Sequence, residues 1–547
     1  MKVRAWRWPV IIVLPALIVA GAVLGTARQS SNNDPNRIGV PSVSPNDSFG
    51  STWYCAAGSA TGTNQGFAEQ TILISNPNSE ARSGLLTVVT STDNTKSKRI
   101  EIPARSVAQF LISDVVTAPW AAALVEVEGG GVSVSHEVLG TAGYDAGPCA
   151  SSPSSQWYFP SGTTLAGTRN LLALFNPFPS EAAVDVTFDT DDGLRAPQAF
   201  QGLVLPGGTL TVIDVGEVVT LRKYVSTTVV SRTGRVIAEQ LQSGDGREGV
   251  ASGLSITLGA TGGTSRWVFP VSVPTQIAVS ETIEIINTED RDITVEIQVI
   301  PDNPEENGYI EPFEVAVPRL RSVSVNVGDD GRIPRSFGHS FIVSASDNAN
   351  IVVQRSSGGR GDIAGLSLLM GIPVAATEWT VPALRSGTPT ASSLHILNPL
   401  SDATATVEVF SYTNGTLTTI GQPIELAPGQ RVRVDTQAVA TATSPSLFIV
   451  RSSSPIAVTA LTRMSTPAEL AVMNAIAYLR TISLLTPIVH LEAPAIEIDA
   501  TDVVPEEAPV DSSTTTLLND PTQTTTTVAG ATTTTTLAPN QLPPTLN

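Results

Sequence analysis

The sequence predicts an all-β protein of four tandem antiparallel β-sandwiches of the immunoglobulin-like kind, and two observations support this. Four Trp residues recur at spacings of 104, 110 and 112 residues. Within each interval, seven or eight short apolar runs alternate with turn residues, a pattern that is typical of sandwiches. A propeller blade is excluded by the period, because blades take about 40–50 residues.

Each predicted repeat opens on one of these tryptophans. The openings are Trp53-Tyr54-Cys55-Ala56, Trp157-Tyr158-Phe159-Pro160, Trp267-Val268-Phe269-Pro270 and Trp379-Thr380-Val381-Pro382. Exposed Trp often stacks on sugar rings. Because these four recur in phase, we expect them to fill the cores instead. Trp120 lies outside the pattern, and we expect it to cap a turn after Asp114.

The second strand of each repeat is expected to end on an Asn. These strands read TILISNP, NLLALFNP, TIEIINT and SLHILNP, and they end at Asn76, Asn176, Asn287 and Asn398. Three of the four Asn residues precede a Pro, which stops a strand and begins a turn. We therefore place the four Asn residues, with the four Trp, among the residues that define the repeat.

A Pro-led turn and further strands complete each repeat. The turns are at Pro103-Ala104, Pro206-Gly207-Gly208, Pro318-Arg319 and Pro428-Gly429. An alternating run such as TLTVIDV follows each turn, as in a half-buried strand, and two more apolar runs close the unit. Helix is expected only in short segments. These are Asp214-Val215-Gly216-Glu217, which has the form of a capping box, and the Ala/Leu-rich stretch from Ala468 to Leu479.

These signals divide the chain into seven parts. The predicted parts are a signal anchor or signal peptide at 1–28, a flexible stalk at 29–50, sandwich repeats at 51–150, 151–263, 264–375 and 376–490, and a disordered acidic tail at 491–547.

The first part has the composition of an export signal. Lys2, Arg4 and Arg7 precede an uncharged run from Trp8 to Ala27, with the basic residues on the side that the positive-inside rule requires. The run is about long enough to span a thin bilayer, so we expect an uncleaved single-pass anchor with the rest of the chain extracytoplasmic. The alternative is cleavage near Ala27, which would give a secreted protein.

The two flanking segments differ from the repeats in composition. Residues 29–50 are rich in Pro, Ser and Asn and show no apolar period, which is typical of a flexible stalk. Residues 491–547 contain eight acidic and no basic residues, with three runs of Thr. Such a tail cannot bury enough apolar area to fold. It is either O-glycosylated or simply solvated.

The repeat resembles an uncharacterised actinobacterial family. The resemblance rests on the Trp-Tyr-Cys-Ala opening, the later Trp-x-Phe-Pro openings, the strands that close in Asn-Pro, and the run Gly-Leu-Ser-Ile-Thr-Leu-Gly at 253–259. It covers roughly residues 50–490. It implies a domain of unknown function in an exported, commonly membrane-tethered protein, and it brings no assigned catalytic residues.

Both cysteines lie in the first repeat. Cys55 follows the opening Trp by two residues, and Cys149 lies just before the second repeat. We expect them to form a disulfide that joins the first and last strands of one sandwich, which an exported compartment permits. Two free buried thiols are the alternative.

Composition excludes several classes of function. The formal charge is −19, so the chain lacks the basic field that nucleic acid binding needs. It contains 4 His and 2 Cys, and none of the His residues has a second His at ligand spacing. We find no motif of a hydrolase elbow or a nucleotide loop. We therefore predict no catalytic residue, cofactor or metal ligand.

Two local motifs have alternative interpretations. Asp189-Thr190-Asp191-Asp192-Gly193 has the acids of a calcium loop but not their alternating spacing. The equivalent segments Thr92-Asp93-Asn94, Asn303-Pro304-Glu305 and Thr413-Asn414-Gly415 favour a hairpin turn. Arg360-Gly361-Asp362 has the integrin-binding sequence, but it is expected to be a Gly-rich turn.

The functional hypothesis therefore rests on architecture. We expect a noncatalytic cell-envelope protein in which four sandwiches form a rod. It would act as a scaffold, adhesion or interaction module for envelope proteins or cell-wall glycan. The alternatives are a carbohydrate-binding module, which would need exposed aromatic residues on one repeat, and a glycan hydrolase, which would need paired carboxylates.

Overall fold

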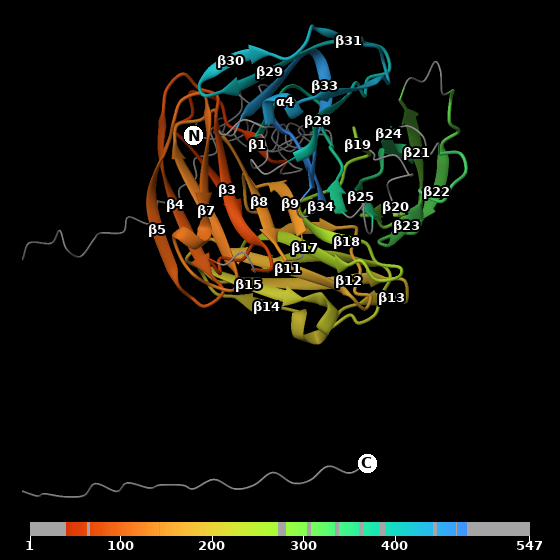
Figure 1. Ribbon diagram of the computed structural model, residues 1–547. Coiled ribbons are helices and arrows are strands. Elements are labelled where there is room, and N and C mark those ends of the chain that lie inside the picture. Colours follow the sequence, from red (N-terminus) through yellow and green to blue (C-terminus); the bar gives the residue numbers. More distant parts are fainter. Residues whose placement is uncertain are drawn as a thin grey trace, which may run out of the picture. The chain divides into compact units, whose positions relative to one another are not determined.

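The computed structural model describes residues 40–62, 66–141, 143–271, 280–302, 308–333, 338–359, 365–382, 389–440, 446–465 and 468–478. All of these residues belong to one compact unit, and strands dominate it (Figure 1). None of its helices has the length and the apolar composition of a membrane span. The predicted anchor at 1–28, the tail at 491–547 and the Arg360-Gly361-Asp362 motif lie outside the described residues.

The strands follow one another in four similar sets. The first set is β2 (Gly50–Cys55), β3 (Glu69–Asn76), β4 (Arg82–Thr90), β5 (Thr95–Ile102), β6 (Ser106–Leu111), β7 (Ala121–Glu128), β8 (Ser133–Gly140) and β9 (Gly143–Pro148). The second is β10 (Gln156–Phe159), β11 (Thr168–Asn176), β12 (Ala182–Thr190), β13 (Gly193–Arg195), β14 (Leu203–Leu205), β15 (Thr209–Asp214), β16 (Val225–Thr233), β17 (Ile237–Asp245) and β18 (Ser252–Leu258).

The remaining two sets repeat the pattern. The third is β19 (Arg266–Phe269), β20 (Ser280–Asn287), β21 (Ile293–Pro301), β22 (Phe313–Val317), β23 (Ser322–Asn326), β24 (His339–Ala345), β25 (Ile351–Gly359) and β26 (Gly365–Met370). The fourth is β27 (Ala376–Pro382), β28 (Pro389–Leu397), β29 (Ala405–Thr413), β30 (Thr416–Thr419), β31 (Ile424–Leu426), β32 (Arg431–Asp435), β33 (Leu447–Ser465) and β34 (Ala468–Asn474).

Each of the first three sets forms two separate antiparallel sheets, and in the fourth set β33 joins the two into one. In the first repeat the sheets have the orders β2-β7-β4-β5 and β6-β3-β8-β9, and the later repeats pair their strands in the same way. In the fourth repeat the long strand β33 contributes to both sheets. Each repeat is thus sandwich-like, as predicted. The immunoglobulin order is not observed, because there the first strand shares a sheet with the second, whereas here it pairs with the sixth.

Helical turns are short and few among the described residues. They are η1 (Ile112–Asp114), η2 (Gln198–Phe200), η3 (Val215–Glu217), η4 (Ser346–Asn348) and α4 (Gln437–Ala440). The Asp214 side chain caps η3 by accepting a hydrogen bond from the Gly216 N–H, as the capping signal predicted.

Each of the predicted Pro-led turns places one residue in the left-handed region, the third residue in three turns and the second, Gly429, in the turn at Pro428. The φ angles are 51° at Arg105, 67° at Gly208, 53° at Leu320 and 69° at Gly429. Glycine adopts this conformation without the steric cost that a side chain brings. Two of the four repeats therefore use glycine at this position.

The four sandwiches pack in a closed circuit. The last strands of the four sets, β9, β18, β26 and β34, lie together at the centre, and each packs against the next, with β34 returning to β9 (Figure 1). The predicted rod is therefore wrong, because the first repeat contacts the fourth. Sequence periodicity defines the repeating unit but does not determine the angle between successive units, which depends on the surfaces that meet.

A clasp between the two ends of the described chain closes this circuit. Strand β1 (Ser42–Val43) runs parallel to β35 (Ile476–Tyr478), and β35 pairs in turn with β27. Residues 42–43 therefore belong to the folded body, although they fall within the predicted stalk. The chain enters and leaves this body at neighbouring points.

The predicted helix from Ala468 to Leu479 is wrong. Its residues form β34 and β35 instead. Ala and Leu favour a helix intrinsically, but β34 pairs along β33 as the eighth strand of its sandwich. Pairing and packing with neighbours override a preference of this size.

The clasp supports a stability prediction. Val43 is 4% exposed and lies in one core cluster with Trp53 and Ile476. We expect Val43→Asp to lose at least the burial free energy of that side chain, about 1.5–3 kcal/mol, and to expose β35. Urea unfolding and amide hydrogen exchange at residues 476–478 measure both effects. Unchanged exchange there would contradict the role of the clasp. Val43→Ile is the conservative control.

Candidate functional site

The four repeat-opening tryptophans are all buried. Trp53, Trp157, Trp267 and Trp379 are 1–2% exposed and rank among the largest buried side chains. The indole N–H groups of Trp157 and Trp267 donate to the main-chain oxygens of Val236 and Ile351 in their own repeats. These residues are core residues, as expected, and they cannot stack on a sugar.

The four strand-ending asparagines make the same hydrogen bonds in every repeat. The Asn76 amide nitrogen donates to the carbonyl oxygens of Glu80, Ile102 and Pro103, and its oxygen accepts from the Asn78 N–H. Asn176, Asn287 and Asn398 repeat this set at the equivalent positions. Each Asn thus joins the turn after the second strand to the Pro-led turn, so its role is structural.

Cys55 and Cys149 form the predicted disulfide, and both residues are fully buried. His136 lies beside them, with potential ligand atoms of the three residues within 4.8 Å of one another. Metal coordination requires thiolates, but both sulfur atoms are already bonded to each other. This group is therefore a structural disulfide with a neighbouring histidine and not a metal site.

Buried polar side chains tie neighbouring repeats together. Glu239 of the second repeat accepts hydrogen bonds from the main-chain N–H groups of Ala56 and Ala57 in the first, at 2.9 and 2.7 Å. Gln354 of the third repeat accepts from Ser161 N–H in the second, at 2.9 Å. Both acceptors lie on the next-to-last strand of their repeat, β17 and β25, and reach the segment after the preceding repeat's opening strand.

The other junctions use different chemistry. Arg431 of the fourth repeat pairs with Asp302 of the third at 2.9 Å and donates to the His339 carbonyl oxygen. The fourth and first repeats meet through apolar side chains, with Leu73 and Tyr144 in the same cluster as Trp379. Sequence reasoning did not identify these ties.

One signal could have identified some of the buried polar positions. Six residues before each strand-ending Asn, the chain carries Gln70, Asn170, Glu281 and Ser392, and all four are buried. A polar residue that recurs at the same register in four apolar strands indicates that each repeat needs a hydrogen bond there. Its partners come from distant segments, so the pattern alone could not name them.

The Glu239 tie is expected to make stability depend on pH. Burial raises the pKa of Glu239 to about 8 and lowers the pKa of His136, whose ring lies 3.6 Å from it, to about 3. A raised carboxyl pKa stabilises the fold below the unfolded value near 4.5, and this contribution is lost as the pH rises through 8. His136 acts oppositely, and its contribution is lost as the pH falls below 6.5.

We therefore expect Glu239→Gln to flatten the fall in unfolding free energy between pH 6.5 and 8, where His136 has little effect. Gln keeps an oxygen acceptor for the two N–H groups but does not titrate. Urea unfolding of both proteins at pH 6.5, 7.2 and 8 gives the two slopes. Equal slopes would show that Glu239 does not titrate in this range. His136→Gln serves as the matched control, because it should alter the pH dependence of the unfolding free energy only below about pH 6.5.

The acidic turn between β12 and β13 is a hairpin in which Asp189 and Asp192 are paired with arginines. Thr190 pairs with Gly193 across it. Asp189 accepts three hydrogen bonds from the Arg321 guanidinium and two from Ser322 in the third repeat, at 2.6–3.1 Å. It is therefore another tie between repeats. Since Asp192 is also paired with arginines, these acids do not converge on a calcium position.

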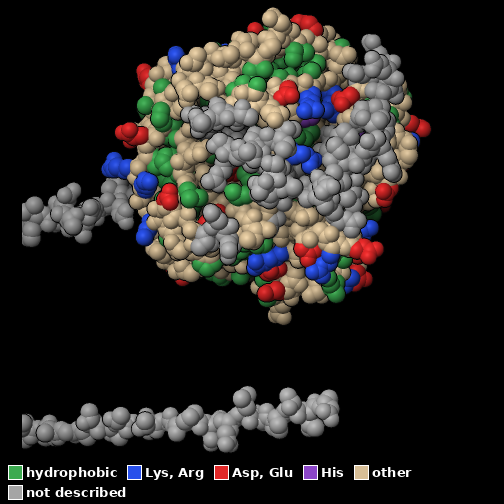
Figure 2. Space-filling model, viewed as in Figure 1, with side chains coloured by type: hydrophobic (Ala, Val, Ile, Leu, Met, Phe, Trp, Pro, Cys, Tyr) green, Lys and Arg blue, Asp and Glu red, His purple; other side chains and the backbone are tan. Residues whose placement is uncertain are grey.

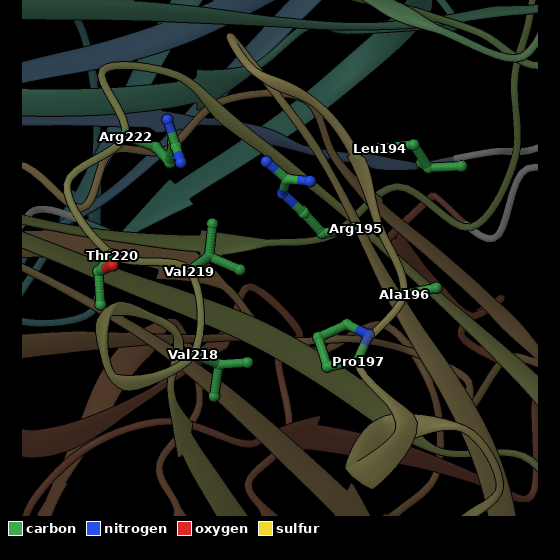
Figure 3. A pocket seen from close by; sticks show the side chains of 8 residues that line it. All are labelled: Leu194, Arg195, Ala196, Pro197, Val218, Val219, Thr220 and Arg222. Atoms are coloured by element: carbon green, nitrogen blue, oxygen red, sulfur yellow. The ribbon is translucent and has the colours of Figure 1, made fainter.

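A pocket of about 420 Å³ opens beside this turn, in the second repeat. Its walls come from β13 with the residues after it, and from the segment that follows η3. The lining residues are Leu194, Arg195, Ala196, Pro197, Val218, Val219, Thr220 and Arg222 (Figure 3). Here the fourth strand is interrupted by η2, which begins just after the lining residue Pro197 and separates β13 from β14.

Two guanidinium groups share one carboxylate oxygen at the mouth of this pocket. Nη2 of Arg195 lies 2.6 Å from Asp192 Oδ2, and Nη2 of Arg222 lies 3.1 Å from the same atom. Figure 3 shows the two side chains extending toward each other from the two walls. The group carries a net positive charge of one in a protein whose total charge is −19.

A second hollow, of about 740 Å³, lies on the third repeat. It is lined by Glu296, Tyr309, Glu311, Pro312 and Glu314, and Tyr309 is 78% exposed. Glu296 and Glu314 stand opposite each other on β21 and β22. Like charges in that position are unfavourable, so this arrangement gains no stability from their pairing.

We predicted that Trp120 caps the turn after Asp114, but its side chain makes other contacts. Its ring packs edge-on against Phe67, with centroids 5.8 Å apart, and the Arg169 guanidinium of the second repeat lies over both rings. Trp120 is thus part of the junction between the first two repeats.

Comparison with known proteins adds a partial family match. Residues 137–367 match the model of a "Family of unknown function (DUF5719)". This agrees with the expectation of an uncharacterised domain and assigns no activity. No curated protein matches the chain.

Two solved structures share limited similarity. A crystal structure of Thermotoga maritima 1070 is 22% identical, with a TM-score of 0.18, over 20% of this chain and 94% of that one. The tetra-tandem repeat in the extending region of a large adhesion protein is 12% identical, with a TM-score of 0.10, over 78% of this chain and 99% of that one. These TM-scores are too low to support an inference about fold or function.

Proposed function

We propose that this protein is a noncatalytic, extracytoplasmic cell-envelope protein that is held at the membrane by residues 1–28 and acts as a scaffold or interaction module. The four sandwiches are, in this proposal, copies of one ancestral unit. The clasp of β1 with β35 carries the proposal, since it brings the segments that lead to the predicted anchor and the predicted tail to neighbouring points. In this proposal, partners meet the strands of each repeat that lie away from the central strands β9, β18, β26 and β34.

Two further observations support this role. The Cys55–Cys149 disulfide is suited to an oxidising compartment. The buried Glu239, Gln354 and Asp189 all serve contacts between repeats. On the face shown in Figure 2, basic and acidic side chains lie beside one another, with no large field of one sign, a distribution that is typical of a soluble protein surface.

Surface labelling tests the location. Lys96 and Lys98 on β5 are exposed, so a membrane-impermeant amine reagent should label them in intact spheroplasts of a cell that expresses the full chain. Labelling only after lysis would refute the location. Retention of the chain in carbonate-washed membranes indicates an anchor, and release indicates a secreted form.

A carbohydrate-binding role is the second candidate, and the hollow around Tyr309 favours it. An exposed ring in a hollow on one repeat is the feature that a glycan-binding sandwich requires. Retention of the full chain on wall polysaccharide that falls with Tyr309→Ala would support this role. Leu417→Ala, which removes another exposed side chain, is the control. Equal retention of both variants would refute it.

A further inference from the structure

We propose that the pocket between Arg195 and Arg222 binds an acidic peptide segment of a partner protein, with one carboxylate on the two guanidiniums and an apolar neighbour against the pocket wall. This inference rests on the proposed function as an interaction module and names the partner chemistry at one site. Three properties of the pocket support it.

The first property is an excess of donors. A guanidinium offers five N–H donors in a planar fork that matches a carboxylate. Arg195 and Arg222 both direct Nη2 at a single oxygen of Asp192, which leaves most of their donors for a second anion. Asp192 is 57% exposed at its side chain and lies in a two-residue turn, so an incoming carboxylate can share the guanidiniums with it.

The second property is apolar wall and rim area. Leu194 and Val218 line the pocket and are 58% and 42% exposed, and Leu221, between the lining residues Thr220 and Arg222, is 65% exposed. Single exposed apolar side chains are ordinary, whereas a group of them beside a charged pocket indicates a contact surface.

The third property is an open sheet edge. Within the described chain, β13 pairs with β12 and has no strand on its other side. An extended peptide can add hydrogen bonds along such an edge, with side chains entering the adjacent pocket. The strand is three residues long, so it suits a short segment.

The same properties disfavour other anions. No aromatic ring lines the pocket, so it lacks the platform on which sugar rings stack. Asp191 and Asp192 lie in the adjoining turn, and their negative charges oppose a dianion such as phosphate more than a singly charged carboxylate.

Binding of a short labelled peptide tests the proposal. The probe is fluorescein-Leu-Glu-Val-Leu-Glu-Val-amide, titrated with the full chain and followed by fluorescence polarisation. We expect saturable binding that weakens with salt. The affinity should fall about tenfold or more in Arg195→Gln/Arg222→Gln. It should fall similarly when Gln replaces Glu in the peptide. Val218→Asp should also weaken it, because it places a like charge against the ligand.

A matched double variant controls for charge. Arg232→Gln/Arg247→Gln removes two exposed arginines of the same repeat that pair with Asp185 and Asp245. It should bind the peptide as the unmodified chain does. Equal loss in both double variants, or equal binding of the Gln peptide, would overturn the proposal.

Competition identifies the ligand class. Inorganic phosphate that displaces the peptide fully, at a concentration equal to the peptide's Kd, would assign the pocket to phosphate and overturn the peptide assignment. Polygalacturonate that binds more tightly than the peptide, and no longer binds Arg195→Gln/Arg222→Gln, would assign the pocket to that polysaccharide and overturn it too. If no probe binds while Lys96 and Lys98 are still labelled in spheroplasts, the inference fails and the proposed location stands. Labelling only after lysis would instead contradict the proposed function.

Discussion

Replacing both cysteines, in Cys55→Ala/Cys149→Ala, is expected to lower the free energy of unfolding by about 4–5 kcal/mol. The two residues are 94 positions apart and fully buried. Opening the bridge restores the chain entropy of this long loop in the unfolded state, and that gain grows with loop length. The first repeat also holds β1, so its loss of stability should weaken the clasp with β35.

Urea unfolding of the oxidised chain and of the double Ala variant measures this difference. Reduction of the unmodified chain should have a similar effect once the bridge is opened in denaturant, because burial protects it in the native state. A difference below about 1 kcal/mol would show that the unfolded chain is already compact, which weakens the entropic effect. Ser51→Ala, at a partly exposed position on the same strand β2, is the control.

Glu281→Ala is expected to destabilise the third repeat by about 3–5 kcal/mol. Glu281 accepts from Nε of Arg355 at 2.9 Å and contacts Nε2 of His339 at 3.1 Å. All three residues are at most 1% exposed. Removal of the carboxylate leaves a buried guanidinium without its counter-charge, and burial already lowers the pKa of Arg355.

The matched double variant separates lost pairing from lost packing. Glu281→Leu/Arg355→Met replaces both charges by apolar groups of similar volume, and it should destabilise less than Glu281→Ala does. The Arg355 guanidinium also donates to the carbonyl oxygen of Val271 and to Ser357, so some loss remains. A double variant as unstable as the single one would show that packing, and not the buried charge, dominates.

The closed arrangement bears on how partners could be bound. A rod would present all four repeats along its length, whereas this circuit directs the last strand of each repeat inward. Sites that lie far from the centre, such as the edge strand β13, are therefore the ones that a partner can reach. The proposed peptide site and the Tyr309 hollow lie at the ends of their sheets, on β13 and near β22.

The residues that define a repeat were predictable from the sequence because their roles are local to one sandwich. Each Trp fills the core between its own two sheets. Each Asn bonds to main-chain atoms within about 30 residues, and the same side chain recurs wherever the same turns recur. Cys55 and Cys149 could be paired for the same reason, since both lie in one repeat.

The candidate pocket could not be predicted in this way. Arg195 and Arg222 are 27 residues apart and lie on different segments, and neither belongs to a recurring motif. They come together because η2 interrupts the fourth strand in this repeat and the segment after η3 turns toward it. The sequence shows the interruption as extra residues but not where the side chains point.

The sequence by itself determined the all-β class, the fourfold repeat, the disulfide and the buried Trp and Asn residues. These features depend on hydrophobic periodicity and on turn residues, which act over a few residues or within one unit. Only the tertiary structure decided the strand order, the strand at Ala468–Asn474, the closed circuit and the pairing of β1 with β35. Those features depend on contacts between residues as much as 435 positions apart. A local sequence pattern does not predict the free energy of such contacts.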